Sequence, residues 1–444
     1  MNRAVAAGFQ GVSLEDAAEF SASLMRMHGC GTGRILSELE AAAVLAVRLS
    51  SLARGASGVR PVVAETLAQL LDRRVLPAIP AEGSVGASGD LTPLSYVAAV
   101  LTGERTVLVR GASEPAASAL FDADIAPIAL GPKEALSLMN GTAVATALGC
   151  LAFDGARRLA RLGSVATAMV SAATHGNPEH FDAFIHAVKP HAGQVRVAGW
   201  IRDDLGGPRH DGGNNRLQDR YSIWCAPHVI GVLVDALTFA QGLIETEIGG
   251  ASDNPLVDVE RGIILHGGNF YGGHVGFALD TLKVAVANLA DLLDRQILLV
   301  CHPAENGGLP QDLRSTGARA SYSHGFKAMS ITASALTAEA LKLCIPASIF
   351  SRSTEAHNQD KVPMATIAAR DTQRIVELTE QVTAIALLAG CQALDLAQVR
   401  VRETRLDAVR ATIRAVVPRL EQDRCMDVDI IAVLGLMRSG ALDA

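Results

Sequence analysis

Long apolar repeats at helical spacing constrain the fold more than any other feature of this 444-residue chain. Within residues 272–300, apolar side chains recur every three or four positions, so they lie on one face of a helix. That face consists of Val275, Leu279, Leu282, Val286, Leu289, Leu293, Ile297 and Val300. Residues 228–249 and 364–389 carry long patterns of the same kind. Because such helices bury their apolar faces against one another, the sequence predicts an all-α bundle of long helices.

Shorter helical patterns and turn-rich segments alternate along the rest of the chain. Further helices are predicted over 13–27, 35–76, 133–172 and, as two shorter pieces, 403–441. Residues 173–222 are rich in His, Gly, Asp and Asn and are expected to be irregular, and only 104–130 has a β-like pattern. We therefore predict three parts, namely an N-terminal helical region over 1–132, a central long-helix bundle over 133–402 and short C-terminal helices over 403–444.

Composition argues against several classes of function. Apolar residues make up 49% of the chain and aromatic residues only 4%, which suits closely approaching helices, and the net charge of −7 indicates no nucleic-acid partner. No uninterrupted apolar run reaches the length of a membrane span and no signal sequence is evident, so no membrane partner is expected. The seven Cys residues are scattered and contain no C-x-x-C pair, which fits a reducing cytoplasm.

A loop rich in Gly, Pro and Ser interrupts the helical pattern over residues 77–93. At its centre, Ala87-Ser88-Gly89 contains the groups needed to make an electrophile from the chain itself. Attack of the Gly89 nitrogen on the Ala87 carbonyl, with loss of water and of the Ser88 hydroxyl, would give a 4-methylidene-imidazol-5-one ring. Gly89 has no side chain to obstruct this attack, and Asp90 is placed to shuttle a proton. Alone, these four residues are a weak signal, because flexible loops often have this composition.

The sequence around this loop resembles a known family. The run GSVGASGDLTPLSYVAAVLTGE at 83–104 and the upstream SLARGASGVR are similar to the signature of the aromatic amino-acid ammonia-lyases and aminomutases, which form this methylidene-imidazolone (MIO) group. Further blocks of the family occur in order, namely Leu138-Met139-Asn140-Gly141-Thr142, Gln218-Asp219-Arg220-Tyr221-Ser222, Ser252-Asp253-Asn254-Pro255-Leu256, Gly267-Gly268-Asn269-Phe270 and Gly390-Cys391-Gln392-Ala393-Leu394-Asp395. The resemblance implies an elongated ammonia-lyase (fumarase/aspartase-like) helical architecture and a homotetramer whose active sites draw residues from three subunits.

The resemblance also implies roles for single residues. The catalytic set would be Ala87, Ser88, Gly89, Asp90, Asn140, Gln218 and Tyr221. The substrate-binding set would be Met27, His28, Trp224, Phe270, Glu355 and Gln359. Taken singly, Asn140 and Gln218 are equally explained as satisfied amides or helix caps, and Tyr221 and Phe270 as packing residues. Their joint occurrence in the order of the family favours the site.

Two positions depart from the pattern of the family. Its general base is a Tyr in a Y-G-x-N-T-G-F-G loop that, by spacing, should lie just before Met1, so either the protein starts further upstream or the base is lost. The tyrosines of this chain all fall in other blocks, at Tyr96, Tyr221, Tyr271 and Tyr322. Trp224 stands where the family has an Arg that grips the substrate carboxylate. We therefore expect free amino acids to bind poorly, unless Arg220 or Lys361 substitutes.

Two indicators of the substrate conflict. His28, after Met27, stands where histidine-specific members carry a His, and it is equally explained as a helix-end residue without a ligand. The block Glu355-Ala356-His357-Asn358-Gln359-Asp360 instead resembles the phenylalanine and tyrosine lyases.

The implied function is elimination of ammonia from an aromatic or histidine-like α-amino acid, or from a derivative that is esterified or carrier-bound. An aminomutase that adds the ammonia back, and a catalytically impaired homologue kept for binding or assembly, are the alternatives, because lid motions that separate lyases from mutases leave no motif. The MIO group would be the only cofactor, since no metal-binding cluster, Walker loop or dinucleotide fingerprint occurs in the sequence.

Overall fold

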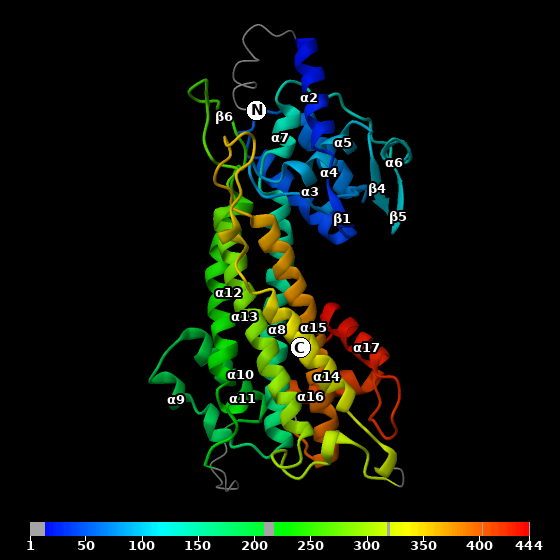
Figure 1. The fold of residues 1–444 in the computed structure, drawn as a ribbon, viewed down its shortest axis with the longest axis vertical. Helices are drawn as coiled ribbons and strands as arrows, with labels where there is room; N and C mark the ends of the chain where they lie inside the picture. The colour runs from blue at the N-terminus through cyan, green and yellow to red at the C-terminus, as the bar shows by residue number, and fades with distance from the viewer. Residues whose placement is uncertain (1–13, 208–216, 318–319, 402, 444) are drawn as a thin grey trace. The chain divides into compact units, whose positions relative to one another are not determined.

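The chain forms two compact units. The computed structural model describes residues 14–207, 217–317, 320–401 and 403–443. The first unit comprises Met1–Ala152, Ala240–Asp280 and Pro346–Gln373, and the second comprises Phe153–Phe239, Thr281–Ile345 and Arg374–Ala444. Both units are mainly helical (Figure 1), so the predicted all-α class is confirmed. The three-part division proposed from the sequence stays a prediction.

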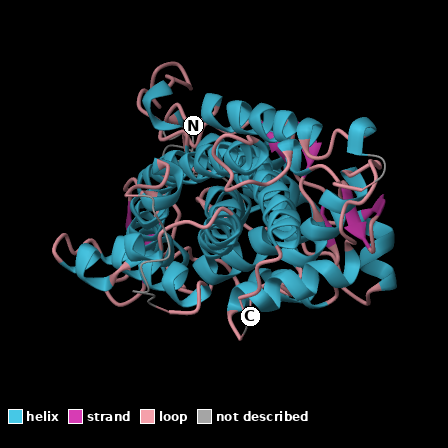
Figure 2. Ribbon diagram, turned by 90° about the horizontal axis from the view of Figure 1, so that it is seen from below, coloured by secondary structure: helices cyan, strands magenta, loops and turns pink. Residues whose placement is uncertain are grey.

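Four long helices dominate the structure, namely α8 (Ala143–Ala173), α12 (Ala226–Gly249), α13 (Gly273–Cys301) and α15 (Ala365–Ala397). In the second unit they pack as a bundle (Figures 1 and 2), as the apolar repeats predict. Small residues allow the close approach. A Cβ added at Gly155 would lie 2.6 Å from Val376 Cγ1, and one added at Gly163 would lie 2.7 Å from Leu289 Cδ1. The low aromatic content of the chain is thus explained by helices that touch through small side chains.

Shorter helices complete both units. The first unit holds α2 (Leu14–His28), α3 (Glu38–Leu52), α4 (Pro61–Asp72), α5 (Leu91–Leu101), α6 (Ala116–Asp122), α7 (Glu134–Met139) and the 3₁₀ turn η4 (Ala347–Phe350). The second unit holds η1 (Pro178–Phe181), α9 (Ala183–Ala187), α10 (Ala192–Asp204), α11 (Tyr221–Trp224), η2 (Gln311–Leu313), η3 (Ala320–Tyr322), α14 (Lys327–Lys342), α16 (Arg405–Val416) and α17 (Asp427–Arg438).

Short antiparallel strands lie in the first unit. β1 (Thr32–Ile35) pairs with β3 (Pro80–Glu82), β4 (Thr106–Val109) lies between β2 (Leu76–Pro77) and β5 (Ala112–Pro115), and β6 (Leu256–Asp258) pairs with β7 (Ile263–Leu265). The expectation that only 104–130 has β structure is therefore wrong. Strands of two to four residues are too short to show an alternating pattern, so the sequence gives no sign of them.

Three predicted segments differ in the structure. The helix expected over 35–76 is divided into α3 and α4, and the one expected over 133–172 is divided into α7 and α8. The expectation of irregular structure over 173–222 is wrong, because α9 and α10 lie there. These short helices depend on individual side chains, since Asp182 accepts from the Phe184 nitrogen at 2.8 Å and Gln194 contacts the His186 ring at 3.0 Å.

Two apolar segments are long enough to cross a membrane by length and composition alone, contrary to the expectation from the sequence. They are Glu134–Ala173 and Tyr221–Gly249. In the first, 78% of the most apolar window is buried inside the protein, and in the second 50%. Core helices of proteins without any membrane span pass the same test, so the two segments are weak grounds for a span.

Candidate active site

The Ala87-Ser88-Gly89 loop lies in the first unit, between β3 and α5. Its backbone is compact, because Ala87 and Gly89 are bridge partners across Ser88. The two residues whose main chains would join in a ring therefore lie side by side. Gly89 has a φ of +73°, and a Cβ there would lie 2.3 Å from the Gly141 nitrogen. Only glycine fits this position.

Asn140 lies beside the loop because the predicted long helix stops there. α7 ends at Met139, and the Asn140 side chain donates from Nδ2 to Ser88 Oγ at 3.3 Å and to the Asn254 carbonyl at 3.2 Å. Its Oδ1 is buried and finds no hydrogen-bond partner in the described ranges of the chain, which is costly for a polar atom unless a further group uses it. An amide that contacts Ser88 and keeps an unused acceptor fits a ring made from residues 87–89.

Asp90 anchors the loop to the start of α8. One carboxylate oxygen accepts from the Val144 nitrogen at 3.0 Å and the Ala145 nitrogen at 2.9 Å, and the other accepts from the hydroxyls of Ser84 and Thr366. Burial raises the pKa of the Asp90 carboxyl, and these hydrogen bonds oppose the rise only in part. A carboxyl that holds its proton more tightly is suited to general acid–base work on the loop beside it.

A buried set of charges, which the sequence analysis missed, lies next to this loop. Lys133 Nζ contacts Asp253 Oδ2 at 2.8 Å and Ser137 Oγ at 2.6 Å. Arg48 Nη1 donates to the Ser252 carbonyl at 2.8 Å, and Nη2 donates to the Ser137 carbonyl. Burial lowers the pKa of Lys133 and lowers that of Arg48 to about 10. The sequence indicates this buried set of charges at one point, because Arg48 stands in the otherwise apolar run AAAVLAVRL.

Thr142, which lies between α7 and α8, connects this part of the chain to α12. Its Oγ1 donates to Glu247 Oε1 at 2.5 Å, and its nitrogen donates to Ser252 Oγ at 3.2 Å. Ser252 Oγ in turn donates to the Asn269 carbonyl at 2.9 Å. Burial raises the pKa of the Glu247 carboxyl. Three of the blocks that resemble the ammonia-lyases, at 138–142, 252–256 and 267–270, therefore meet in one hydrogen-bonded cluster.

The proposed substrate residues Glu355 and Gln359 belong to a strained turn of the first unit. Glu355, Ala356 and His357 have φ values of +47°, +52° and +65°, a left-handed run that is unfavourable for residues with a side chain. Hydrogen bonds hold it closed, because Thr354 Oγ1 donates to Gln359 Oε1 at 2.7 Å and the two main chains also pair. Glu355 is exposed.

Met27, His28 and Phe270 also lie in the first unit, and among the described residues they make no hydrogen bond to the loop at 87–89. Met27 is 60% exposed at the end of α2. His28 Nδ1 lies 2.9 Å from the Leu24 carbonyl of the preceding turn, as expected for a helix-end residue. Phe270 is half-buried just before α13. Their roles as substrate selectors stay predictions.

Gln218, Tyr221 and Trp224 belong to the second unit. Gln218 is exposed and Tyr221 is 73% exposed. The Trp224 ring contacts the rings of Tyr221 and His180, with centroids 5.5 Å and 5.1 Å away. Its Nε1 is buried and has no hydrogen-bond partner within the part of the chain that the structure describes. Tyr221 and Trp224 therefore pack together in α11, Gln218 lies just before it, and the part of all three in catalysis stays a prediction.

Arg220, a candidate for replacing the missing guanidinium, is already paired in the second unit. Its Nε donates to Glu305 Oε2 at 3.1 Å and its Nη2 donates to Glu305 Oε1. Neighbouring Asp219 is structural, since it accepts from the Asn177 nitrogen at 2.7 Å and its nitrogen donates to His180 Nε2 at 3.2 Å. The other candidate, Lys361, is exposed in the first unit.

Comparison with known proteins gives a consistent result. The family described as aromatic amino acid lyase matches residues 8–415. The chain is 40% identical to a histidine ammonia-lyase from Koribacter versatilis, with 95% of this chain and 84% of that protein covered. Its fold matches the crystal structure of histidine ammonia-lyase from Trypanosoma cruzi with a TM-score of 0.90 and 35% identity, over 98% of this chain and 83% of the other. Tyrosine aminomutase from Streptomyces globisporus matches with a TM-score of 0.90 and 34% identity, over 97% and 85%.

The predicted resemblance is thus confirmed over nearly the whole chain, including the long helices and the loop at 87–89. The chain belongs to the aromatic amino acid lyase family, and it is an enzyme of the ammonia-lyase type.

Proposed function

We propose that this protein eliminates ammonia from an aromatic or histidine-like α-amino acid, or from a derivative of one, by means of a methylidene-imidazolone group made from Ala87, Ser88 and Gly89. The observation that carries the proposal is the packing of this loop, with Ala87 beside Gly89 and the Asn140 amide on Ser88. When formed, that group would supply an electrophilic carbon that turns the amino group of the substrate into a leaving group.

The residues of the chain have separate tasks in this proposal. Asn140 Nδ2 orients the Ser88 hydroxyl, 3.3 Å away, which must leave during ring formation. Asp90, whose pKa is raised by burial, follows Gly89 directly and would pass a proton to the departing hydroxyl. Gln218 and Tyr221, just before and at the start of α11, would contact the substrate. Glu355 and Gln359 of the left-handed turn would contact it as well.

Trp224 affects how the carboxyl group of the substrate is bound. An indole offers one neutral N–H donor, whereas a carboxylate is held best by two parallel bonds from a guanidinium. Among the described residues the buried Trp224 N–H has no hydrogen-bond partner, and Arg220 is paired with Glu305. We therefore propose that the preferred substrate has its acid group neutralised, as an amide, an ester or a carrier-bound thioester.

An aminomutase is the second candidate, favoured by the equal fold similarity to tyrosine aminomutase and to histidine ammonia-lyase. The two reactions share the loss of ammonia and differ in whether it is added back at the β carbon. Product analysis separates them, because a lyase releases an α,β-unsaturated acid and a mutase releases a β-amino acid.

The proposal is tested by the intact mass of the purified protein. Ring formation removes two waters, so the chain should be lighter by about 36 Da than its sequence mass. Ser88→Ala has no hydroxyl to lose, so its intact mass should equal the mass of its own sequence or fall short of it by one water at most. Its release of ammonia should stop. Folded wild-type protein with the full sequence mass would contradict the proposal.

A further inference from the structure

Arg48 is a buried cation to which the reaction above assigns no task. It lies in α3 with no exposed surface. In the part of the chain that the structure describes, its guanidinium donates to main-chain carbonyls, those of Ser137 and Ser252, and its Nε is buried without a partner. A buried charge is expensive, so its retention beside a reactive loop calls for a specific role.

The two carbonyls belong to the segments that hold Asn140. Ser137 lies in the last turn of α7, three residues before Asn140. Ser252 lies two residues before Asn254, whose carbonyl accepts from Asn140 Nδ2 at 3.2 Å. A guanidinium can bridge two acceptors at once because its donors form a rigid planar fork. Arg48 therefore ties together the two segments that fix the Asn140 side chain.

Gly141 lies between the Arg48 guanidinium and the loop at 87–89. A Cβ at Gly141 would lie 2.1 Å from Arg48 Nη1, and a Cβ at Gly89 would lie 2.3 Å from the Gly141 nitrogen. The guanidinium, the Gly141 main chain and Gly89 are thus packed in that order without space between them. On the side of the loop, the Asp90 nitrogen donates to the Gly141 carbonyl at 2.7 Å.

We propose that Arg48 is a positioning residue for the formation of the ring, because it holds the Gly141 main chain against Gly89 and so keeps the Gly89 nitrogen at the Ala87 carbonyl. This inference rests on the proposed function. In the step concerned, the Gly89 nitrogen bonds to the Ala87 carbonyl carbon, and the Ala87 oxygen leaves as water with the amide protons of Gly89 and Ser88. The Ser88 hydroxyl leaves as a second water with the Ser88 Cα proton, so no oxidant is needed.

The test variant is Arg48→Lys, which keeps the charge and loses the planar fork. Arg60→Lys is the matched control. Arg60 grips Glu134, at the other end of α7, through Nε at 2.8 Å and Nη2 at 2.6 Å. The same substitution at the two ends of one short helix separates general support of α7 from support of the Asn140–Gly141 segment.

The experiment follows the intact mass of full-length protein after a pulse of synthesis, with thermal melting to select variants that are folded. Wild type and Arg60→Lys should lose about 36 Da at the same rate. Arg48→Lys should melt as a folded protein and dehydrate more slowly by about tenfold to a hundredfold, the effect of one lost charged hydrogen bond. Arg48→Gln, which retains a donor without the charge, should be at least as slow.

Three results would overturn the inference. They are a folded Arg48→Lys that dehydrates like wild type, an equal slowing in Arg60→Lys, and a failure of both Arg48 variants to fold, which would make Arg48 a support of the fold as a whole. Wild-type protein without the 36 Da loss would instead refute the proposed function, so the two failures are distinguishable.

Discussion

At the scale of single residues, we propose that Trp224 favours a substrate whose acid group is neutralised. A guanidinium at this position would give a free carboxylate a charged partner, and a charged hydrogen bond contributes about 1.5–3 kcal/mol. Trp224→Arg should therefore raise kcat/KM for free tyrosine, histidine or phenylalanine by about tenfold to a hundredfold, measured as ammonia release. The same change should slow turnover of an aryl amide or thioester.

Arg220→Gln is the control for this prediction. Because Arg220 is paired with Glu305, its loss should leave the preference between free and neutralised substrates unchanged. Efficient turnover of free tyrosine or histidine by the wild type, abolished by Arg220→Gln or Lys361→Gln, would show that another cation binds the carboxylate.

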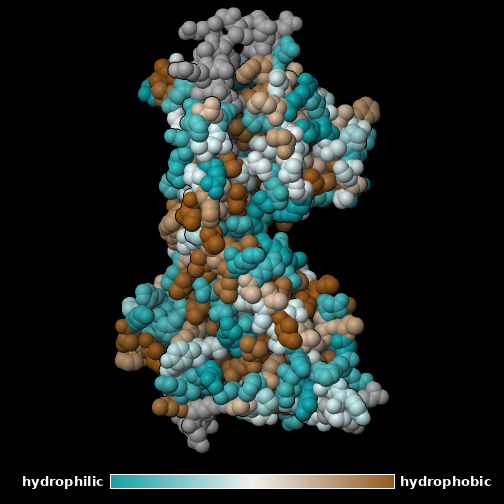
Figure 3. All heavy atoms as spheres, viewed as in Figure 1, coloured by the Kyte–Doolittle hydropathy of each residue, from teal (hydrophilic) through white to brown (hydrophobic). Residues whose placement is uncertain are grey.

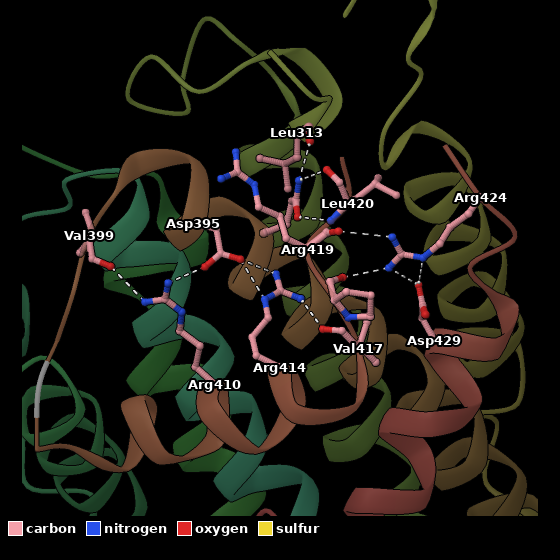
Figure 4. A network of polar contacts seen from close by, with 12 residues as sticks. Leu313, Asp395, Val399, Arg410, Arg414, Val417, Arg419, Leu420, Arg424 and Asp429 are labelled. Atoms are coloured by element: carbon pink, nitrogen blue, oxygen red, sulfur yellow. Dashed lines mark hydrogen bonds and ion pairs between the residues drawn. The ribbon is translucent and has the colours of Figure 1, made fainter. Parts of the chain in front are cut away.

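At the scale of elements, the family block at 390–395 joins α15 to α16 and to the C-terminal loop. Asp395 lies between two guanidiniums, accepting from Arg414 Nε at 2.8 Å and from Arg410 (Figure 4). Gln392 is buried and bonds both main-chain groups of Leu420 at 3.0 Å. This block, which resembles part of the family signature, therefore holds secondary-structure elements of the second unit together.

Asp395→Ala should destabilise the protein, since it leaves two mostly buried guanidiniums without their carboxylate. Removing one partner of a buried pair costs about 3–5 kcal/mol. Asp291→Ala, which breaks an exposed pair with Arg295, should cost about 0–1 kcal/mol. Urea unfolding at one fixed protein concentration measures both. Equal midpoints for the two variants would contradict the assigned role of Asp395.

At the scale of the whole molecule, apolar side chains that stay exposed on helices of the second unit indicate self-association. Val232 of α12, Val284 of α13 and Ile331 of α14 are 60%, 45% and 64% exposed. Figure 3 shows apolar residues among polar ones on the face it draws. Burial of these side chains against other copies of the chain would stabilise an assembly.

We therefore predict a homotetramer, with a mass by light scattering of about four times that of the 46.3 kDa chain. Ile331→Asp should lower this mass, because a charge on an interface helix is costly to bury. A stable monomer of the wild type at micromolar concentration would contradict the tetramer and the sharing of active sites between subunits.

Features that depend on local order could be predicted from the amino-acid sequence. The long helix expected over 272–300 is found at Gly273–Cys301, and the one expected over 228–249 at Ala226–Gly249, because helical periodicity is a property of neighbouring residues. The candidate loop at 87–89 and Asn140 are likewise predicted from motifs that are contiguous in the chain, and the structure places the Asn140 amide on Ser88.

How these pieces come together around the loop at 87–89 depends on contacts between segments that are distant in the sequence. The break between α7 and α8 lies in a continuous apolar pattern, and it is held by Arg48, Asp90 and Ser252, which are distant in sequence. The left-handed turn at 355–357 opposes local preference and persists through the Thr354–Gln359 hydrogen bonds. Both features are locally unfavourable, so their stability comes from contacts that no local pattern encodes.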